Sequence, residues 1–144
     1  MTPKAASVTP DAKSKEYGAA DPALTGTLSG FLAGDGVTAT YSRTAGETVA
    51  GSPYTISATL SPAGVLSNYS ITYNTANFTI TPKAATWTTN PNSKAYGASD
   101  ANPLATGNGT GFLVADNVTA TYTRATGDCL VTITSLRRCL QPLC

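Results

Sequence analysis

The residues of this chain that are best suited to chemistry are its eight carboxylates. Four of them recur in similar surroundings, as the pairs Asp21 with Asp100 and Glu47 with Asp128. Two carboxylates that face each other across a groove could act as the general acid and base of a hydrolase. All four stand beside turn residues, however, and such side chains commonly cap turns. We therefore expect turn capping, and a hydrolase fragment is the alternative that a carboxylate pair or an activated serine in a pocket would identify.

Other chemical signals are weak. The absence of histidine removes the commonest general base and metal ligand. The glycine-rich loop Gly107–Gly111 lacks the lysine that a phosphate-binding loop requires. Asp35 and Asp116, with nearby carbonyl oxygens, could bind calcium, but a solvated loop is the simpler interpretation. The sequence thus predicts no catalytic residue, no cofactor and no metal site, and it favours a protein that is not an enzyme.

Two tyrosines, Tyr17 and Tyr96, are each followed by glycine and occur at equivalent places in the chain. If exposed, they could stack on the sugar rings of a glycan; if buried, they would anchor a strand to the core with the hydroxyl at its edge. We favour packing, because both copies keep the residue near a module joint. Tyr17, Tyr96, Asp21 and Asp100 are therefore the candidate ligand-binding or module-contact residues.

These candidates are positioned by an internal repeat. Thr2–Ala6 returns unchanged as Thr81–Ala85, at a distance of 79 residues. From Phe31 and Phe112 onward the offset is 81, so the second copy has two extra residues near Asn102. Such self-similarity is typical of arrays in which one module is used many times. We predict a complete module at 1–82 and an incomplete one at 83–128, directly joined and forming a stiff rod.

The composition predicts an all-β fold. Threonine occurs 25 times, and β-branched and aromatic residues alternate with polar ones between turn residues. One helical turn is plausible at 30–35. The segments 37–41 and 54–60 should pair as neighbours, and 68–73 with 76–80 should form a hairpin around Asn74-Thr75. Shorter strands are expected at 6–9 and 24–28.

Charge and hydropathy exclude some partners. Only 12% of the residues are charged and the net charge is +1, which is too little to hold nucleic acid by counterion release. No apolar run is long enough for membrane insertion, and no signal peptide is recognisable. Because Met1 stands where the second copy has Ile80, we expect the chain to be a piece of a longer protein.

The repeat is lost after Asp128, and all three cysteines (Cys129, Cys139 and Cys144) follow this point. With suitable codons, a shifted reading frame from Thr134 onward gives a peptide that agrees with Ile56–Leu66 at nine of eleven positions. We therefore interpret 129–144 as a frameshifted tail. The missing strands should leave open sheet edges in the second module, one of which Leu130–Thr134 could cover as a substitute strand.

The segment Lys15–Leu24, together with Ile80–Ala84, resembles the MBG repeat, a mostly-β, glycine-rich module of the YGX type. The resemblance covers 2–83 and then 84–128. It implies a grasp-like or sandwich-like fold with at most one short helix. It also implies tandem occurrence in bacterial surface and secreted proteins, including adhesins, without catalytic residues.

The leading functional hypothesis is consequently a structural or adhesive repeat of an exported bacterial surface protein. A carbohydrate-binding module is the alternative, which an exposed aromatic shelf or calcium on one face would favour. The expected partners are neighbouring repeats of the parent protein and a cell-surface glycan or protein. The expected location is extracellular or at the cell surface.

Overall fold

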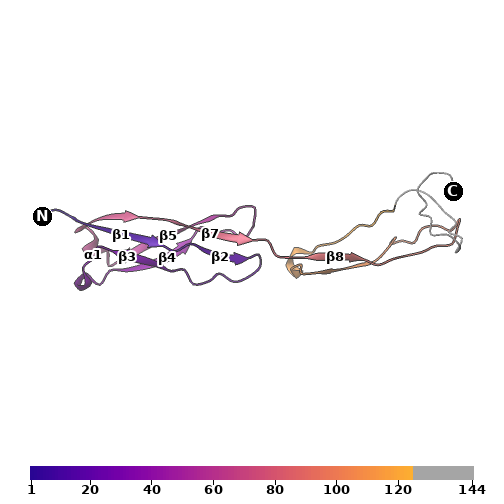
Figure 1. The fold of residues 1–144 in the computed structure, drawn as a ribbon, viewed down its shortest axis with the longest axis horizontal. Helices are drawn as coiled ribbons and strands as arrows, with labels where there is room; N and C mark the ends of the chain where they lie inside the picture. Colours follow the sequence, from indigo (N-terminus) through magenta and orange to yellow (C-terminus); the bar gives the residue numbers. More distant parts are fainter. Residues whose placement is uncertain (125–144) are drawn as a thin grey trace, which may run out of the picture. The chain divides into compact units, whose positions relative to one another are not determined.

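The computed structural model describes residues 1–124, and the chain divides into two units, Met1–Lys83 and Ala84–Cys144 (Figure 1). Both consist of strands with very short helices, so the predicted all-β fold class is confirmed. The strands of the first unit are β1 (Lys4–Pro10), β2 (Lys13–Glu16), β3 (Gly26–Ser29), β4 (Thr38–Arg43), β5 (Tyr54–Ser61), β6 (Tyr69–Tyr73) and β7 (Ala76–Thr81). Its helices are the 3-10 turn η1 (Ala33–Asp35) and α1 (Ala63–Leu66).

The seven strands of the first unit form two sheets. One has the order β3-β1-β6 and the other the order β2-β7-β5-β4. β1 pairs antiparallel with β3 and parallel with β6, while β2 pairs parallel with β7. β5 lies antiparallel between β4 and β7. Each sheet therefore contains one parallel pair, contributed by the beginning and the end of the repeat.

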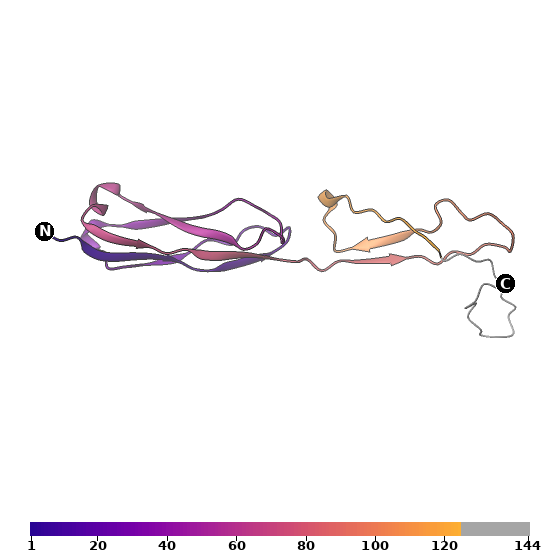
Figure 2. The same ribbon diagram turned by 90° about the horizontal axis from the view of Figure 1, so that it is seen from above.

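These two parallel pairs share one register. Lys4 lies opposite Tyr69 in the first pair, and Lys13 lies opposite Phe78 in the second, a separation of 65 residues in both. Asn74 joins them, because its N–H donates to the Val8 carbonyl at 3.0 Å and its side-chain amide donates to the Thr9 hydroxyl at 2.9 Å. The segments 4–16 and 69–81 thus run side by side through the first unit (Figures 1 and 2).

The predicted hairpin of 68–73 with 76–80 is wrong. β6 pairs with β1 and β7 pairs with β5 and β2, so the two strands belong to different sheets. Tight two-residue hairpin turns favour glycine, because they need positive φ angles. The pair Asn74-Thr75 contains no glycine. The chain therefore continues in nearly the same direction from β6 into β7.

Other local predictions are confirmed. β4 and β5 pair antiparallel, from Thr38 opposite Ser61 to Arg43 opposite Ile56. The expected helical turn is η1, which ends at Gly36 in the left-handed conformation with φ 58°. Helix α1 was not predicted, because its four residues are too few to show a helical period.

The core of the first unit is thin and follows the alternation of β1, β5 and β7. Val8, Ile56 and Phe78 are fully buried, and Ile80 is almost so. Ile56, Phe78 and Ile80 form one cluster, against which half-buried tyrosines and Leu24 pack. With so few buried side chains, each should carry a large share of the stability.

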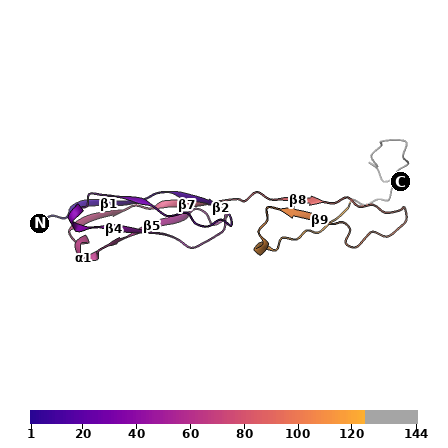
Figure 3. The same cartoon turned by 90° about the horizontal axis from the view of Figure 1, so that it is seen from below.

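The second unit contains β8 (Thr86–Thr89), β9 (Gly107–Thr110) and the 3-10 turn η2 (Val114–Asp116) (Figure 3). Thr86 lies opposite Thr110 as Ser7 lies opposite Ser29, so β8–β9 reproduces the register of β1–β3. The segments 92–95 and 119–124, which align with β2 and β4, form no strand. The reason is that β2 and β4 pair with β7 and β5, whose counterparts are not found in 84–124.

The interpretations of Asp128, of the substitute strand Leu130–Thr134 and of the tail 129–144 with its cysteines concern residues outside the described range. Within residues 1–124, no helix has the length and apolar character that crossing a membrane requires.

Candidate functional site

The tyrosine-glycine motif lies at the end of β2. The Tyr17 N–H donates to the Thr81 carbonyl at 2.9 Å, which extends the pairing of β2 with β7. Gly18 has φ 80°, a conformation that favours glycine, and it turns the chain so that Ala19 N–H can donate to the Glu16 carbonyl at 3.0 Å. The Tyr17 ring is half-buried against the core cluster. In the first unit the motif therefore turns the chain and adds an aromatic ring to the core.

Next to this turn, Arg43 at the end of β4 uses all five of its N–H donors. Its Nε donates to Asp21 Oδ2 at 2.6 Å and its Nη2 to Asp21 Oδ1 at 3.0 Å, which is the bidentate geometry. Nη1 donates to the carbonyls of Thr44 at 3.1 Å and Gly46 at 2.7 Å, and Nη2 also donates to Glu47. The guanidinium thus binds four residues in two loops, one that contains Asp21 and one that spans Thr44 to Glu47.

The Arg43 guanidinium also contacts the aromatic rings of Phe78 and Tyr54. Its central carbon lies 4.6 Å from the centroid of the Phe78 ring and 5.5 Å from that of Tyr54. Such cation–π contacts are stronger when the cation is shielded from water, and the Arg43 side chain is only 9% exposed. Arg43 therefore connects the hydrophobic core to the loops at this end of the unit.

Lys15 of β2 completes a group of four charged residues, which we call the charge cluster (Lys15, Asp21, Arg43 and Glu47). The Lys15 ammonium lies 2.7 Å from Asp21 and also binds Glu47, and its side chain is 5% exposed. The carboxylates lie outside, with Asp21 38% and Glu47 62% exposed. Two shielded cations are thus covered by two solvated carboxylates.

The cluster keeps its members charged. Arg43, with Lys15, lowers the pKa of Asp21 to about 2, and Lys15, with Arg43, lowers the pKa of Glu47. Asp21 in turn raises the pKa of both Lys15 and Arg43. At neutral pH both carboxylates are therefore ionised and paired with the two cations. In the fold, the side chains of Asp21 and Glu47 both bind the cations Lys15 and Arg43.

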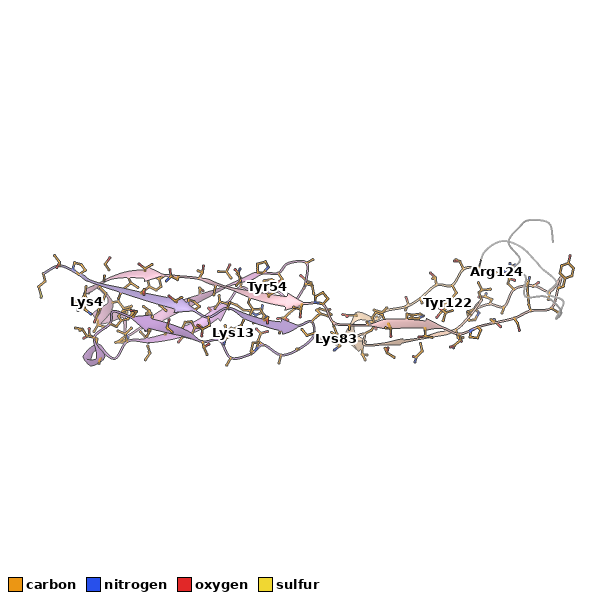
Figure 4. All side chains as sticks on the ribbon, viewed as in Figure 1. Lys4, Lys13, Tyr54, Lys83, Tyr122 and Arg124 are labelled. Atoms are coloured by element: carbon orange, nitrogen blue, oxygen red, sulfur yellow. The ribbon has the colours of Figure 1, made fainter. Side chains whose placement is uncertain are left out.

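The second unit has the same arrangement in part. Asp100 lies 2.7 Å from Arg124 Nε and 2.9 Å from the Lys94 ammonium, and Arg124 with Lys94 lowers its pKa to about 2. Arg124 and Tyr122 come from one segment, as Arg43 and Tyr41 do (Figure 4). Tyr96, by contrast with Tyr17, is 68% exposed.

Sequence reasoning named Asp21 and Asp100 but missed the lysine and arginine that bind them. A usable signal was present. Lys15 and Lys94, and likewise Arg43 and Arg124, recur at the offsets of the repeat, in a chain with few charged residues. Charges that both copies keep together with an aspartate indicate an ion-pair cluster.

Asp35, considered above for calcium, has a partner in the fold. Its carboxylate accepts a hydrogen bond from the Tyr69 hydroxyl, which itself accepts one from the Leu32 N–H at 3.0 Å. The bond to Asp35 raises the pKa of Tyr69. Among residues 1–124, no three histidine, cysteine, aspartate or glutamate side chains are grouped as a metal would require.

The lowered pKa of Asp21 makes stability depend on pH. Because the folded-state pKa lies near 2 and the ordinary value near 3.8, the contribution of Asp21 is complete above about pH 4 and is lost as the pH falls toward 2. We expect Asp21→Asn to lower the melting temperature of the first unit at pH 7, and the two melting curves to converge near pH 2. Melting followed by circular dichroism between pH 2 and 7 tests this; a constant difference at all pH values would contradict it.

Comparisons with known proteins give one match. No curated protein and no solved structure matches the chain. The family model described as the MBG domain of the YGX type matches residues 6–79, from β1 to β7, which is about half of the chain and includes the whole charge cluster. The chain therefore belongs to the MBG domain family of the YGX type.

Proposed function

We propose that this chain is a structural, non-catalytic repeat of an exported bacterial surface protein, which acts by spacing and by surface contacts. MBG domains are structural repeats that occur in surface proteins. The proposed location is the cell surface or the extracellular space, and the proposed partners are neighbouring repeats and a cell-surface glycan or protein.

One observation carries this proposal. The segments 4–16 and 69–81 run parallel in one register, so the chain enters the first unit at one end and leaves it at the other (Figure 1). Thirteen extended residues at about 3.3 Å each span about 43 Å. A module whose first and last strands are parallel adds its full length to the parent chain, as a spacer requires.

We further propose that 83–128 is an incomplete second copy of the same module. The support lies in equivalent local contacts. Asp11 N–H donates to the Thr25 carbonyl at 2.8 Å, and Asn90 N–H donates to the Thr106 carbonyl at 2.7 Å. Gly30 and Gly111 both have φ 83°, and in each case an added Cβ would lie under 2.5 Å from a carbonyl oxygen, that of Ala5 or Ala84.

The spacer function is tested by measuring how the length of the protein grows with the number of modules. Chains with one, two and four copies of residues 2–80 in direct succession would be compared by small-angle X-ray scattering. We expect the maximum dimension to rise by about 40 Å for each copy, because each module contributes one strand length. A dimension that grows much more slowly with copy number would contradict a stiff spacer.

Limited proteolysis should distinguish the two units. Lys15 and Arg43 lie within paired strands, and their side chains are 5% and 9% exposed. Lys94 and Arg124 lie outside strands, with side chains 26% and 39% exposed. Since trypsin needs a locally extended, accessible backbone, we expect cleavage after Lys94 or Arg124 at least about ten times faster. Equal resistance of the two units, read by mass spectrometry, would contradict this.

Carbohydrate binding is the second candidate, and a cavity of about 330 Å³ supports it. Lys4, Asp35, Ser67 and Asn68 line this cavity, and their polar groups could bind sugar hydroxyls. A glycan array probed with the full chain tests it. A specific signal that Asn68→Ala abolishes would favour this function, and a blank array would favour the spacer.

A further inference from the structure

The second unit exposes a surface whose counterpart in the first unit is covered by the first unit's own strands. This surface, which we call the acceptor face, consists of Trp87, Tyr122 and the edge of β8 that has no neighbouring strand among residues 1–124. We propose that the acceptor face binds an extended polypeptide segment with the pattern of β5–β7, which adds strands to the second unit in trans. This interaction is separate from the spacer function and does not depend on it.

The first unit shows what covers the equivalent surface. β1 has β3 on one edge and β6 on the other, and the Val8 carbonyl accepts a hydrogen bond from the Asn74 N–H at 3.0 Å. Val8 is fully buried there. In the second unit Trp87 has the place of Val8, and among the described residues β8 has only β9 beside it. Trp87 is 37% exposed.

An open strand edge is a template for another strand. Its unpaired N–H and carbonyl groups can pair with an added chain, while pockets for alternate side chains provide specificity. In the first unit the tyrosines Tyr17 and Tyr41 pack on the cluster of Ile56, Phe78 and Ile80. Tyr96 and Tyr122 align with these two tyrosines. The acceptor face therefore offers the backbone edge of β8 together with the rings of Trp87 and Tyr122, and Tyr122 has the place of a tyrosine that packs on this cluster.

The β8–β9 part of the acceptor face has the register of its counterpart in the first unit. Trp87 Nε1 donates to the Tyr122 hydroxyl at 3.1 Å. The Trp87 ring also lies 6.1 Å from that of Phe112. The indole occupies space beside Gly109, where the first unit has Leu28 beside Val8. A preformed surface of this kind loses less conformational freedom when it binds.

The chemistry of the occupant follows from the segment that fills this place in the first unit. Residues 54–82 contain no charged residue and alternate apolar with hydroxyl-bearing side chains, and their buried members are Ile56, Leu60, Tyr69, Phe78 and Ile80. The partner is thus an uncharged, threonine- and serine-rich extended chain. Charged segments are disfavoured, because Trp87 and Tyr122 would be brought against unpaired charge.

A synthetic peptide of residues 54–82 added to the full 144-residue chain tests the proposal, with hydrogen exchange followed by mass spectrometry. We expect amide exchange in 85–89 and 119–124, the counterparts of β1 and β4, to slow at least about tenfold, as new strand pairing protects amides. Exchange in 1–83 should stay unchanged, because there the equivalent edges are already paired.

The matched control is the same peptide carrying Phe78→Asp, which we expect to bind at least about tenfold more weakly, since a charge replaces the central apolar contact. Equal protection by both peptides, or no protection by either, would overturn the proposal. Before peptide is added, slow exchange of those amides in 85–89 that do not pair with β9 would overturn it as well, because another part of the chain or a second copy would then cover the edge.

Discussion

Phe78→Ala is expected to remove most of the stability of the first unit. The Phe78 side chain is fully buried at the centre of a cluster whose other buried members are Ile56 and Ile80. Phenylalanine-to-alanine changes in cores cost about 3–5 kcal/mol, and a domain of this size has a free energy of unfolding of only about 4–12 kcal/mol. The loss should be at the upper end, because the Arg43 guanidinium also rests on the Phe78 ring at 4.6 Å.

Urea unfolding followed by circular dichroism measures this change, and hydrogen exchange of the β5 and β7 amides assigns it to the first unit. The expected fall in melting temperature is about 15–30 °C. Tyr73→Ala is the matched control, because Tyr73 lies in β6, the strand that precedes β7 in the chain, but is 53% exposed. Its effect should stay within about 0.5 kcal/mol. Similar losses for both variants would show that Phe78 is not at the centre of the core.

The parts of the fold that sequence predicted depend on neighbouring residues. The pairing of β4 with β5 follows from two strongly alternating segments, and the end of η1 follows from Gly36, which adopts a left-handed conformation. Gly30 and Gly111, which occupy equivalent places in the repeat, have the same φ angle. Identical residues in identical local surroundings adopt the same conformation, so these features needed no knowledge of tertiary structure.

The features that sequence missed depend on residues far apart in the chain. β6 and β7 follow each other closely, yet their partners are β1 and β2, 65 residues earlier. No local pattern distinguishes this parallel pairing from a hairpin, since both bury alternate side chains. The charge cluster was missed for the same reason: Lys15, Asp21 and Arg43 come from three segments that only the sheet brings together.

Arg43→Lys is expected to destabilise the first unit although it preserves the charge. Lysine has three donors on a flexible stem, whereas the planar guanidinium binds Asp21 through two nitrogens, Glu47, and the carbonyls of Thr44 and Gly46. The substitution leaves the partly buried Gly46 carbonyl without its donor, breaks the bidentate pair with Asp21 and removes a flat cation from the Phe78 ring. We expect a loss of about 2–3 kcal/mol, or about 10–20 °C in melting temperature.

Arg124→Lys, the equivalent change in the second unit, provides the matched control. Arg124 pairs with Asp100 as Arg43 pairs with Asp21, but its side chain is 39% exposed. Exposed ion pairs contribute little, so this variant should leave the melting of the first unit unchanged. The loss in Arg43→Lys should also persist in 1 M salt, because donors shared with carbonyls and an aromatic ring are screened much less than an exposed ion pair. If high salt abolished the difference between wild type and Arg43→Lys, the cluster would be a surface ion pair only, and Arg43 would not connect the core to the loops of the tyrosine-glycine end.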